Sequence, residues 1–267
     1  MSNDDVEKIT ELAEQAAQLA GQLLRERWRQ PRELSEKGFR DWVTDADYAS
    51  QALLTETIRD AYPDHGFLAE EEGADLPATG DVIWIIDPVD GTSNYSRQQP
   101  NFCISLAAFR RDKALTGVIY DPIRRELFRA TRGDGSYLNR QRITTSDVSD
   151  VKRAIVALDW SHAPRARQQT LEMLQQVAHE VHTIRAIGSA ALALAWLAAG
   201  RLDAYFNLSL KPWDYAAGAL LIELAGGQIR DLRGWDPTPD KGACRCLATN
   251  GFLYEPFSHL ITSNGLP

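Results

Sequence analysis

The strongest restriction on the fold comes from a run of five apolar residues, Val82 to Ile86, that leads directly into an acidic segment. A strand with apolar side chains at every position has no polar face to turn toward water, so we expect it to be buried on both faces. Burying both faces of a sheet needs a large core. The chain has 267 residues, of which 44% are apolar, and this is enough to build one.

The charge balance bears on the partners. Acidic residues outnumber basic ones by 37 to 29, which gives a formal net charge of −8. Nucleic acids and anionic membranes attract clustered lysine and arginine, so we expect neither as a partner, whereas an excess of carboxylates favours cations. The longest weakly polar stretch, 186–200, is too short to cross a bilayer. Residues 1–5 are polar and acidic, which is not typical of a signal peptide, and we expect a cytoplasmic protein.

Hydrophobic periodicity predicts two blocks of secondary structure. The first block has helices and strands at 5–29, 44–61, 82–86, 102–109, 115–120 and 126–130, with a polar break at 30–40. The second block has them at 154–158, 165–179, 190–199, 202–206, 214–225, 228–231 and 245–249. A polar stretch with Ser and Thr clusters, 139–150, separates the blocks. We therefore predict an N-terminal α+β lobe, residues 1–143, and a C-terminal α/β lobe, residues 144–267.

The segment Asp87 to Asn94, after the apolar run, is the most informative for chemistry. The strand delivers Asp87 at its carboxyl end, where α/β proteins usually place their sites, and Asp90 follows three residues later. Two carboxylates held this close repel each other unless a proton or a cation lies between them. Gly91 and Thr92 then offer backbone N–H groups, at an expected helix start, where a phosphate can bind. Hard oxygen ligands beside an anion-binding turn are what metal-assisted phosphoryl transfer requires.

Each acidic residue also has a purely structural explanation. Asp87 and Asp90 suit an Asx turn followed by a tight turn. Asp214 precedes an Ala-rich run and suits an N-cap, although the small residues after it allow closer packing than a cap needs. Asp47 suits a capping box at the start of the second helix. The three consecutive glutamates that begin at Glu70 usually mark a solvated loop.

Five segments together resemble the inositol monophosphatase family of Mg²⁺-dependent, lithium-sensitive phosphatases, which is related to fructose-1,6-bisphosphatase. Any one of these motifs is weakly specific, but five in the family's order and spacing, from about residue 8 to residue 250, are very specific. They are Asp41 to Asp47, Glu70-Glu71, Asp87 to Asn94, Gly188 to Ala191 and Trp213 to Gly218. The resemblance implies an α/β (α+β) fold, a layered αβαβα sandwich of the sugar phosphatase type, in agreement with two lobes.

The resemblance also implies two or three Mg²⁺ ions. Glu70, Asp87 and the backbone carbonyl of Val89 match the ligands of a first ion. Asp87, Asp90 and Asp214 match those of a second ion, and Glu70 also serves a weaker third ion through water molecules. Lys37 lies in a segment that is a mobile, metal-responsive loop in the family.

The implied reaction is hydrolysis of a small sugar or polyol phosphate, such as inositol monophosphate, by in-line attack of a metal-activated water. Thr92, hydrogen-bonded to Asp47, matches the pair that orients this water and helps to deprotonate it, and Glu70 contributes through the third ion. The residues that match the phosphate cradle and neighbouring substrate contacts are Asp90, Gly91, Thr92, Ser93 and Ala190.

One position departs from the family. Asn207 stands where many inositol phosphatases have a glutamate that contacts the sugar hydroxyls, and an amide both donates and accepts, so the hydroxyl preference should differ. Asn207 also suits a residue that merely ends a strand. Fructose 1,6-bisphosphate and 3′-phosphoadenosine 5′-phosphate are therefore alternative substrates. Arg185 is a candidate for holding a second phosphate, although a surface salt bridge is its commoner use.

A second class of function is a regulatory, non-enzymatic binding protein on the same fold, since some bacterial relatives contact the transcription machinery. A scaffold has no need of the complete set of acidic residues and threonine, so the sequence favours the enzyme. The resemblance further implies a homodimer.

Overall fold

The apolar run becomes the second strand of a seven-stranded sheet. In the computed structural model, which describes residues 2–30, 34–38, 41–73 and 79–262, β4 spans Val82–Asp90 and is buried along almost its whole length. It pairs in parallel with β3 and antiparallel with β5, and the other strands follow as antiparallel neighbours in the order β3-β4-β5-β6-β7-β8-β9. The other six are β3 (Gly66–Ala69), β5 (Cys103–Arg110), β6 (Lys113–Asp121), β7 (Glu126–Thr131), β8 (Gly135–Leu138) and β9 (Gln141–Arg142).

A five-stranded sheet follows, in the order β11-β10-β12-β14-β13. Strand β10 is parallel to β11 and β12, whereas β14 is antiparallel to β12 and β13. A separate two-stranded hairpin joins β1 and β2. These strands are β10 (Ile155–Leu158), β11 (Thr183–Ala186), β12 (Ala204–Leu210), β13 (Gln228–Asp231), β14 (Cys244–Thr249), β1 (Leu34–Gly38) and β2 (Asp41–Thr44).

The helices begin and end where local chemistry predicts. The Ser2 hydroxyl accepts from the backbone of Asp5 and caps α1, and α2 ends just before Pro63. Helix α5 is buried all round, as its Ala/Leu-rich sequence requires. The α-helices are α1 (Asn3–Arg27), α2 (Asp45–Ala61), α3 (Thr92–Ser96), α4 (Pro164–Glu180), α5 (Ala190–Ala198), α6 (Pro212–Leu224) and α7 (Tyr254–Thr262). Two short 3₁₀ turns are η1 (Val151–Arg153) and η2 (Pro239–Lys241).

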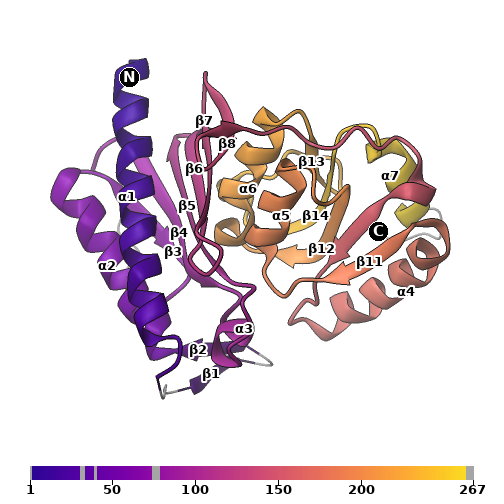
Figure 1. Cartoon of the computed structure of the whole chain (residues 1–267), viewed down its shortest axis with the longest axis horizontal. Coiled ribbons are helices and arrows are strands. Elements are labelled where there is room, and N and C mark those ends of the chain that lie inside the picture. The colour runs from indigo at the N-terminus through magenta and orange to yellow at the C-terminus, as the bar shows by residue number, and fades with distance from the viewer. Residues whose placement is uncertain (1, 31–33, 39–40, 74–78, 263–267) are drawn as a thin grey trace.

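Helices and sheets alternate in five layers (Figure 1). Helices α1 and α2 cover the outer face of the seven-stranded sheet, α5 and α6 lie between the two sheets, and α4 and α7 cover the outer face of the five-stranded sheet. Buried apolar residues form a core at each level: one around Trp84, a central one around Leu194 and an outer one around Phe206. The predicted αβαβα sandwich is confirmed.

Some elements were not predicted. Residues 34–38, inside the expected polar break, form β1, and β11 has only four residues, too few to show a period. Helix α7 was overlooked although Phe257, Leu260 and Ile261 have helical spacing. The predicted boundary between residues 143 and 144 falls between β9 of the larger sheet and β10 of the smaller one, and the division into lobes stays a prediction. Within the described ranges, no helix is both long and apolar enough to span a membrane.

Candidate active site

Two of the predicted metal ligands, Asp87 and Asp90, lie at the carboxyl end of β4. Asp87 pairs with Ser105 of β5 and Asp90 pairs with Cys103, so three steps along β4 correspond to two along β5. Side chains of a regular strand alternate between faces, so residues three apart would point in opposite directions. The irregularity at Pro88 removes this alternation, and proline suits it because it has no N–H to pair. Both carboxylates therefore reach the same space.

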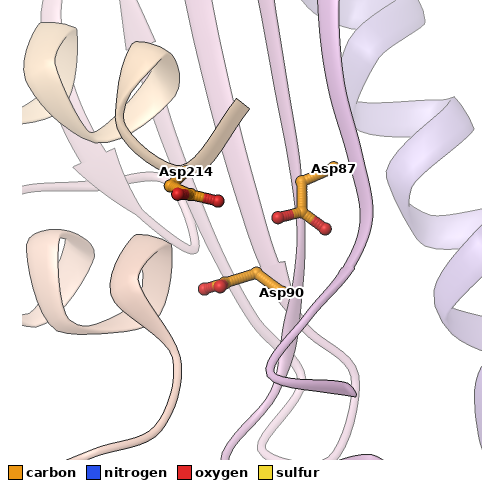
Figure 2. Close-up of side chains that lie close together, drawn as sticks. All are labelled: Asp87, Asp90 and Asp214. Carbon is orange, nitrogen blue, oxygen red and sulfur yellow. The ribbon is translucent and has the colours of Figure 1, made fainter. Parts of the chain in front are cut away.

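A third carboxylate comes from the central helical layer. Asp214 lies in the first turn of α6, and ligand oxygens of Asp87, Asp90 and Asp214 all lie within 4.8 Å of one another (Figure 2). The Asp214 carboxylate also accepts a hydrogen bond from the Lys211 backbone at 2.6 Å, so it caps the helix as well. We call these three residues the aspartate cluster.

Close packing brings α6 to this position. A Cβ atom on Gly218 would lie 2.6 Å from Cβ of Leu194 on α5, and one on Gly117 of β6 would lie 2.8 Å from the backbone oxygen of Ala217. Neither position has room for a side chain. The small residues after Asp214 thus allow the close packing that the sequence suggested, because α6 is held against α5 on one side and the sheet on the other.

The aspartate cluster is electrostatically costly without a counter-charge. Burial raises the pKa of Asp87, Asp90 and Asp214, and the charge of each neighbouring carboxylate raises the pKa of Asp87 and Asp214 further. A divalent cation bound by hard oxygen ligands removes this repulsion. The donor set therefore fits Mg²⁺.

Glu70 and Glu71 lie next to this cluster and share one lysine. The Lys37 ammonium lies 3.1 Å from Glu70 and 2.7 Å from Glu71, and although burial opposes its charge, the two carboxylates together raise the pKa of Lys37. Burial raises the pKa of Glu70 to about 7. Glu71 is buried, and its Oε2 atom makes no hydrogen bond among the described residues. Glu70 lines the same cavity as the aspartate cluster, whereas the mobility expected for the Lys37 segment stays a prediction.

The Asp90 carboxylate is held by the start of α5, in the helical layer between the two sheets. It accepts hydrogen bonds from the Ser189 hydroxyl at 2.5 Å and from the backbone of Ala191 at 2.7 Å and Ala190 at 3.3 Å. Asp90 therefore caps α5, whereas the side chain of the N-cap residue itself, Ser189, makes no capping hydrogen bond to the helix. The backbone of Ala190, predicted as a substrate contact, is directed toward Asp90.

Thr92 and Asp47 are in contact, as the resemblance implied. The Thr92 hydroxyl lies 2.8 Å from Oδ1 of Asp47 and 3.1 Å from the backbone oxygen of Val89. The other oxygen of Asp47, Oδ2, accepts from the backbone and hydroxyl of Thr44 at 3.0 and 2.5 Å. Burial raises the pKa of Asp47 to about 6.

The turn that starts α3 requires glycine. Gly91 has φ +98°, and a Cβ atom there would lie 2.9 Å from the backbone oxygen of Asn101. The Asn94 side-chain amide donates to the carbonyl oxygens of Asn101 at 2.7 Å and Ile187 at 2.9 Å, which connects this turn to the loop before α5. Gly91, Thr92 and Ser93 all line the cavity of the site.

The cavity has a volume of about 420 Å³ and extends from the aspartate cluster to residues after β10 that the sequence analysis missed. Asp159, directly after β10, is buried and accepts from the Gly188 backbone at 2.6 Å and the Tyr205 hydroxyl at 3.3 Å. Its place at the carboxyl end of a parallel strand is the signal that would have found it. Trp160, Ser161 and His162 follow it in the same segment, whereas no such signal marks the other residues of this wall, Arg167 and Ser209.

The two predicted specificity residues lie in different places. Asn207 lines the cavity, its carbonyl oxygen accepts from the Ser209 backbone at 3.0 Å, and its amide lies 3.5 Å from the Tyr205 hydroxyl. Arg185, on β11, is exposed and donates to Thr183 and to the backbone of Ile184. It does not belong to the described lining of the cavity.

Comparison with known proteins shows the family of the chain. The sequence pattern of the Inositol monophosphatase family matches residues 5–263. The chain belongs to the inositol monophosphatase family. Nus factor SuhB of Escherichia coli (strain K12) is 40% identical to this chain over 226 residues, which are 84% of this chain and 85% of that protein.

Two solved structures extend the comparison. The inositol monophosphatase from Anabaena (Nostoc) sp. PCC 7120 is 34% identical, has a TM-score of 0.84 and covers 97% of each chain. An IMPase/NADP phosphatase complexed with Mg²⁺ and phosphate is 25% identical, has a TM-score of 0.86 and covers 98% of this chain and 97% of that one. The inositol monophosphatase family is Mg²⁺-dependent. Membership and these neighbours support a phosphatase activity in general, in accord with the buried aspartate cluster.

Proposed function

We propose that this chain is a Mg²⁺-dependent phosphomonoesterase that hydrolyses a small sugar or polyol phosphate, such as inositol monophosphate, by in-line attack of water. The observation that carries the proposal is the aspartate cluster, whose ligand oxygens lie within 4.8 Å of one another in a cavity that also holds Thr92. A merely structural role would not collect three acidic side chains whose pKa values burial raises.

We assign the metal ligands as the family resemblance implied. Glu70, Asp87 and the Val89 carbonyl would hold one Mg²⁺ ion, Asp87, Asp90 and Asp214 a second, and Glu70 a weaker third through water. When bound, Mg²⁺ polarises the phosphoryl group, favours ionisation of water and neutralises the leaving alkoxide. Glu70 also lies 3.1 Å from Lys37, so this lysine must release Glu70 for the carboxylate to bind a cation with its full charge.

The remaining steps belong to side chains and backbone groups of the chain. Thr92 orients the attacking water. Its oxygen accepts a proton from that water as its own hydroxyl proton passes to Oδ1 of Asp47, 2.8 Å away. The backbone N–H groups of Gly91, Thr92 and Ser93 bind the phosphate, since the turn at Gly91 opens α3. No described cysteine or serine lies in a nucleophile motif, so we expect no covalent phosphoenzyme.

The leaving group of the substrate faces the wall built after β10. Asn207 is held by Ser209 and Tyr205, so its amide is oriented and contributes to the choice among hydroxylated leaving groups. Fructose 1,6-bisphosphate and 3′-phosphoadenosine 5′-phosphate remain alternative substrates.

The experiment is phosphate release in the presence of Mg²⁺ from inositol 1-phosphate, fructose 1,6-bisphosphate, glycerol 2-phosphate and adenosine 3′,5′-bisphosphate. We expect turnover that requires Mg²⁺, decreases with Li⁺ and is lost in Asp90→Asn. Turnover that persists in Asp90→Asn would contradict the proposed site.

A second candidate function is a regulatory role without catalysis, favoured by the name Nus factor of a relative that is 40% identical. Asp90→Asn separates the two functions, because it removes a proposed metal ligand and leaves the outer surface unchanged. A partner complex that survives this substitution while turnover is lost would show that the chain has both functions. Complex formation by a wild-type chain that hydrolyses no ester of the panel would favour the regulatory role alone.

We also propose a homodimer and a cytoplasmic location. A light-scattering mass near the 29.8 kDa of one chain would contradict the dimer.

A further inference from the structure

The segment after β10 brings one arginine, Arg167, into the lining of the cavity. Among the described lining residues, five are acidic, and Arg167 is the only lysine or arginine. Four of the five acidic residues belong to the proposed metal site, where Mg²⁺ would neutralise their charge. The fifth, Asp159, is buried and accepts from the Gly188 backbone and the Tyr205 hydroxyl. Arg167 is thus the permanent positive charge of the described lining.

Arg167 has no carboxylate partner among the described residues. Its only described side-chain contacts are a hydrogen bond from Nη1 to the backbone oxygen of Ser161, at 3.1 Å, and the ring of Trp160, whose centroid lies 5.2 Å from the guanidinium carbon. No described residue accepts a hydrogen bond from its Nε or Nη2 atom. By contrast, Arg124 and Arg233 pair with buried carboxylates at 2.7 Å.

The surroundings hold the guanidinium in place. Ser161 is buried, and its hydroxyl is fixed between the backbone of Ala163 at 3.0 Å and the hydroxyl of Ser209 at 2.5 Å. The carbonyl that accepts from Arg167 is therefore fixed, and stacking on Trp160 sets the plane of the guanidinium. An arginine ordered before binding loses less entropy when it binds an anion.

Arg167 carries a charge that the dipole of its own helix does not favour. It lies in the first two turns of α4, where the helix dipole disfavours a cation, and the first turn has no acidic residue to offset this. A role in ligand binding explains an arginine at this position better than a role in helix stability does.

We propose that Arg167, stacked on Trp160, is a subsite for a second anionic group on the substrate. The favoured substrates are then phosphomonoesters whose leaving group carries another phosphate or a carboxylate. The inference rests on the proposed function, since the reacting phosphate must lie at the aspartate cluster. It differs from the expectation for Arg185, which is exposed on β11 and lies outside the described cavity lining.

The test uses alkylphosphonates, because a phosphatase does not cleave their C–P bond. Ethyl-, propyl- and butylphosphonate are compared with the diphosphonates of equal chain length by titration calorimetry with the full chain in excess Mg²⁺. We expect one diphosphonate to bind about tenfold more tightly than its monophosphonate, the gain typical of one charge-assisted hydrogen-bonded contact. The chain length that binds most tightly reports the separation of the two subsites.

Variants assign the gain. In Arg167→Ala the diphosphonate should lose its advantage while the monophosphonate affinity stays within about twofold of the wild-type value, which also shows that the variant is folded. Arg167→Lys should keep part of the gain, because the charge remains but the planar fork is lost. Arg185→Ala, the matched control, should bind both probes as the wild type does.

The outcomes separate the two proposals. A diphosphonate that binds no more tightly than its monophosphonate, or an advantage that persists in Arg167→Ala, overturns the subsite and leaves the proposed function intact. If no monophosphonate binds in Mg²⁺, the phosphate-binding site itself is wrong, and the subsite is overturned with it.

Discussion

Asp47 shows how one carboxylate can satisfy two explanations that looked like alternatives in the sequence. Its Oδ2 atom completes the capping box with Thr44, and its Oδ1 atom contacts Thr92, so the structural role leaves one oxygen for the site. This capping box uses only one of the two carboxylate oxygens. The same holds for Asp214, which accepts from Lys211 and still belongs to the aspartate cluster.

The Thr92 hydroxyl provides the first prediction. Thr92→Ala removes the donor to Asp47, and we expect kcat to fall by about 100-fold or more, since general acid–base groups contribute about that much. Thr92→Ser keeps the hydroxyl and should retain most of the activity. Steady-state kinetics with the best ester of the panel measures both. Equal loss in the two variants would mean that the methyl group matters and the hydroxyl does not.

Asp159 gives a prediction for stability against pH. Burial raises its pKa in the folded chain from 3.8 to about 7. Between these values the unfolded chain loses this proton while the folded chain keeps it, so the contribution of Asp159 to stability decreases as pH rises from about 4 to about 7. In Asp159→Asn this decrease is absent.

The measurement is urea unfolding in EDTA at several pH values across that window. The free energy of unfolding of Asp159→Asn minus that of the wild type should increase with pH and become constant above about pH 7. A difference that does not vary with pH would contradict the assignment.

At the level of elements, the sequence predicted what local patterns determine. The apolar run predicted β4. Hydrophobic periodicity located most of the other strands of the two large sheets and most of the helices. The hairpin of β1 was missed because Leu34 is the only apolar side chain of the strand, so no apolar alternation marks it. The cap of α5 was missed for another reason: Asp90 supplies it from a strand about 100 residues earlier, and a contact across such a distance leaves no local pattern.

The site could be predicted in the same way only in part. Asp87 and Asp90 follow an apolar strand, a pattern that can be recognised without a structure. Arg167 is one of several polar residues near the start of an ordinary amphipathic helix, and only the folded chain places it beside Trp160.

Helix α6 yields a prediction about packing. Gly218→Ala adds a methyl group 2.6 Å from Leu194, so we expect the free energy of unfolding to fall by about 1–3 kcal/mol, the usual cost of overpacking. Because α6 carries Asp214, stabilisation by Mg²⁺ should also decrease. Ala219→Gly on the same helix is the control: it costs about 1 kcal/mol of helix propensity and should leave the effect of Mg²⁺ unchanged. Urea unfolding with and without Mg²⁺ measures both quantities.

The molecule as a whole should respond to Mg²⁺. The ion binds the folded chain and relieves repulsion within the aspartate cluster, so at a concentration near 100 Kd it adds about 2.7 kcal/mol to the free energy of unfolding. For a chain of this size we expect the melting temperature to rise by about 5–10 °C. Asp214→Asn should reduce the rise. Equal melting temperatures in chelator and in several millimolar Mg²⁺ would contradict the metal site.

The cluster draws its ligands from segments far apart in the chain: Asp87 and Asp90 lie on β4, whereas Asp214 opens α6, and α5 holds Asp90. During synthesis the seven-stranded sheet can therefore leave the ribosome while its acidic edge still lacks the last ligand. Domains generally fold from the N-terminus as they emerge, so the aspartate cluster can be completed only after α6 has been made and docked. A nascent chain cut short before α6 would carry the proposed ligands of the first ion but lack the last ligand of the second, so binding of the second ion would report that α6 has docked.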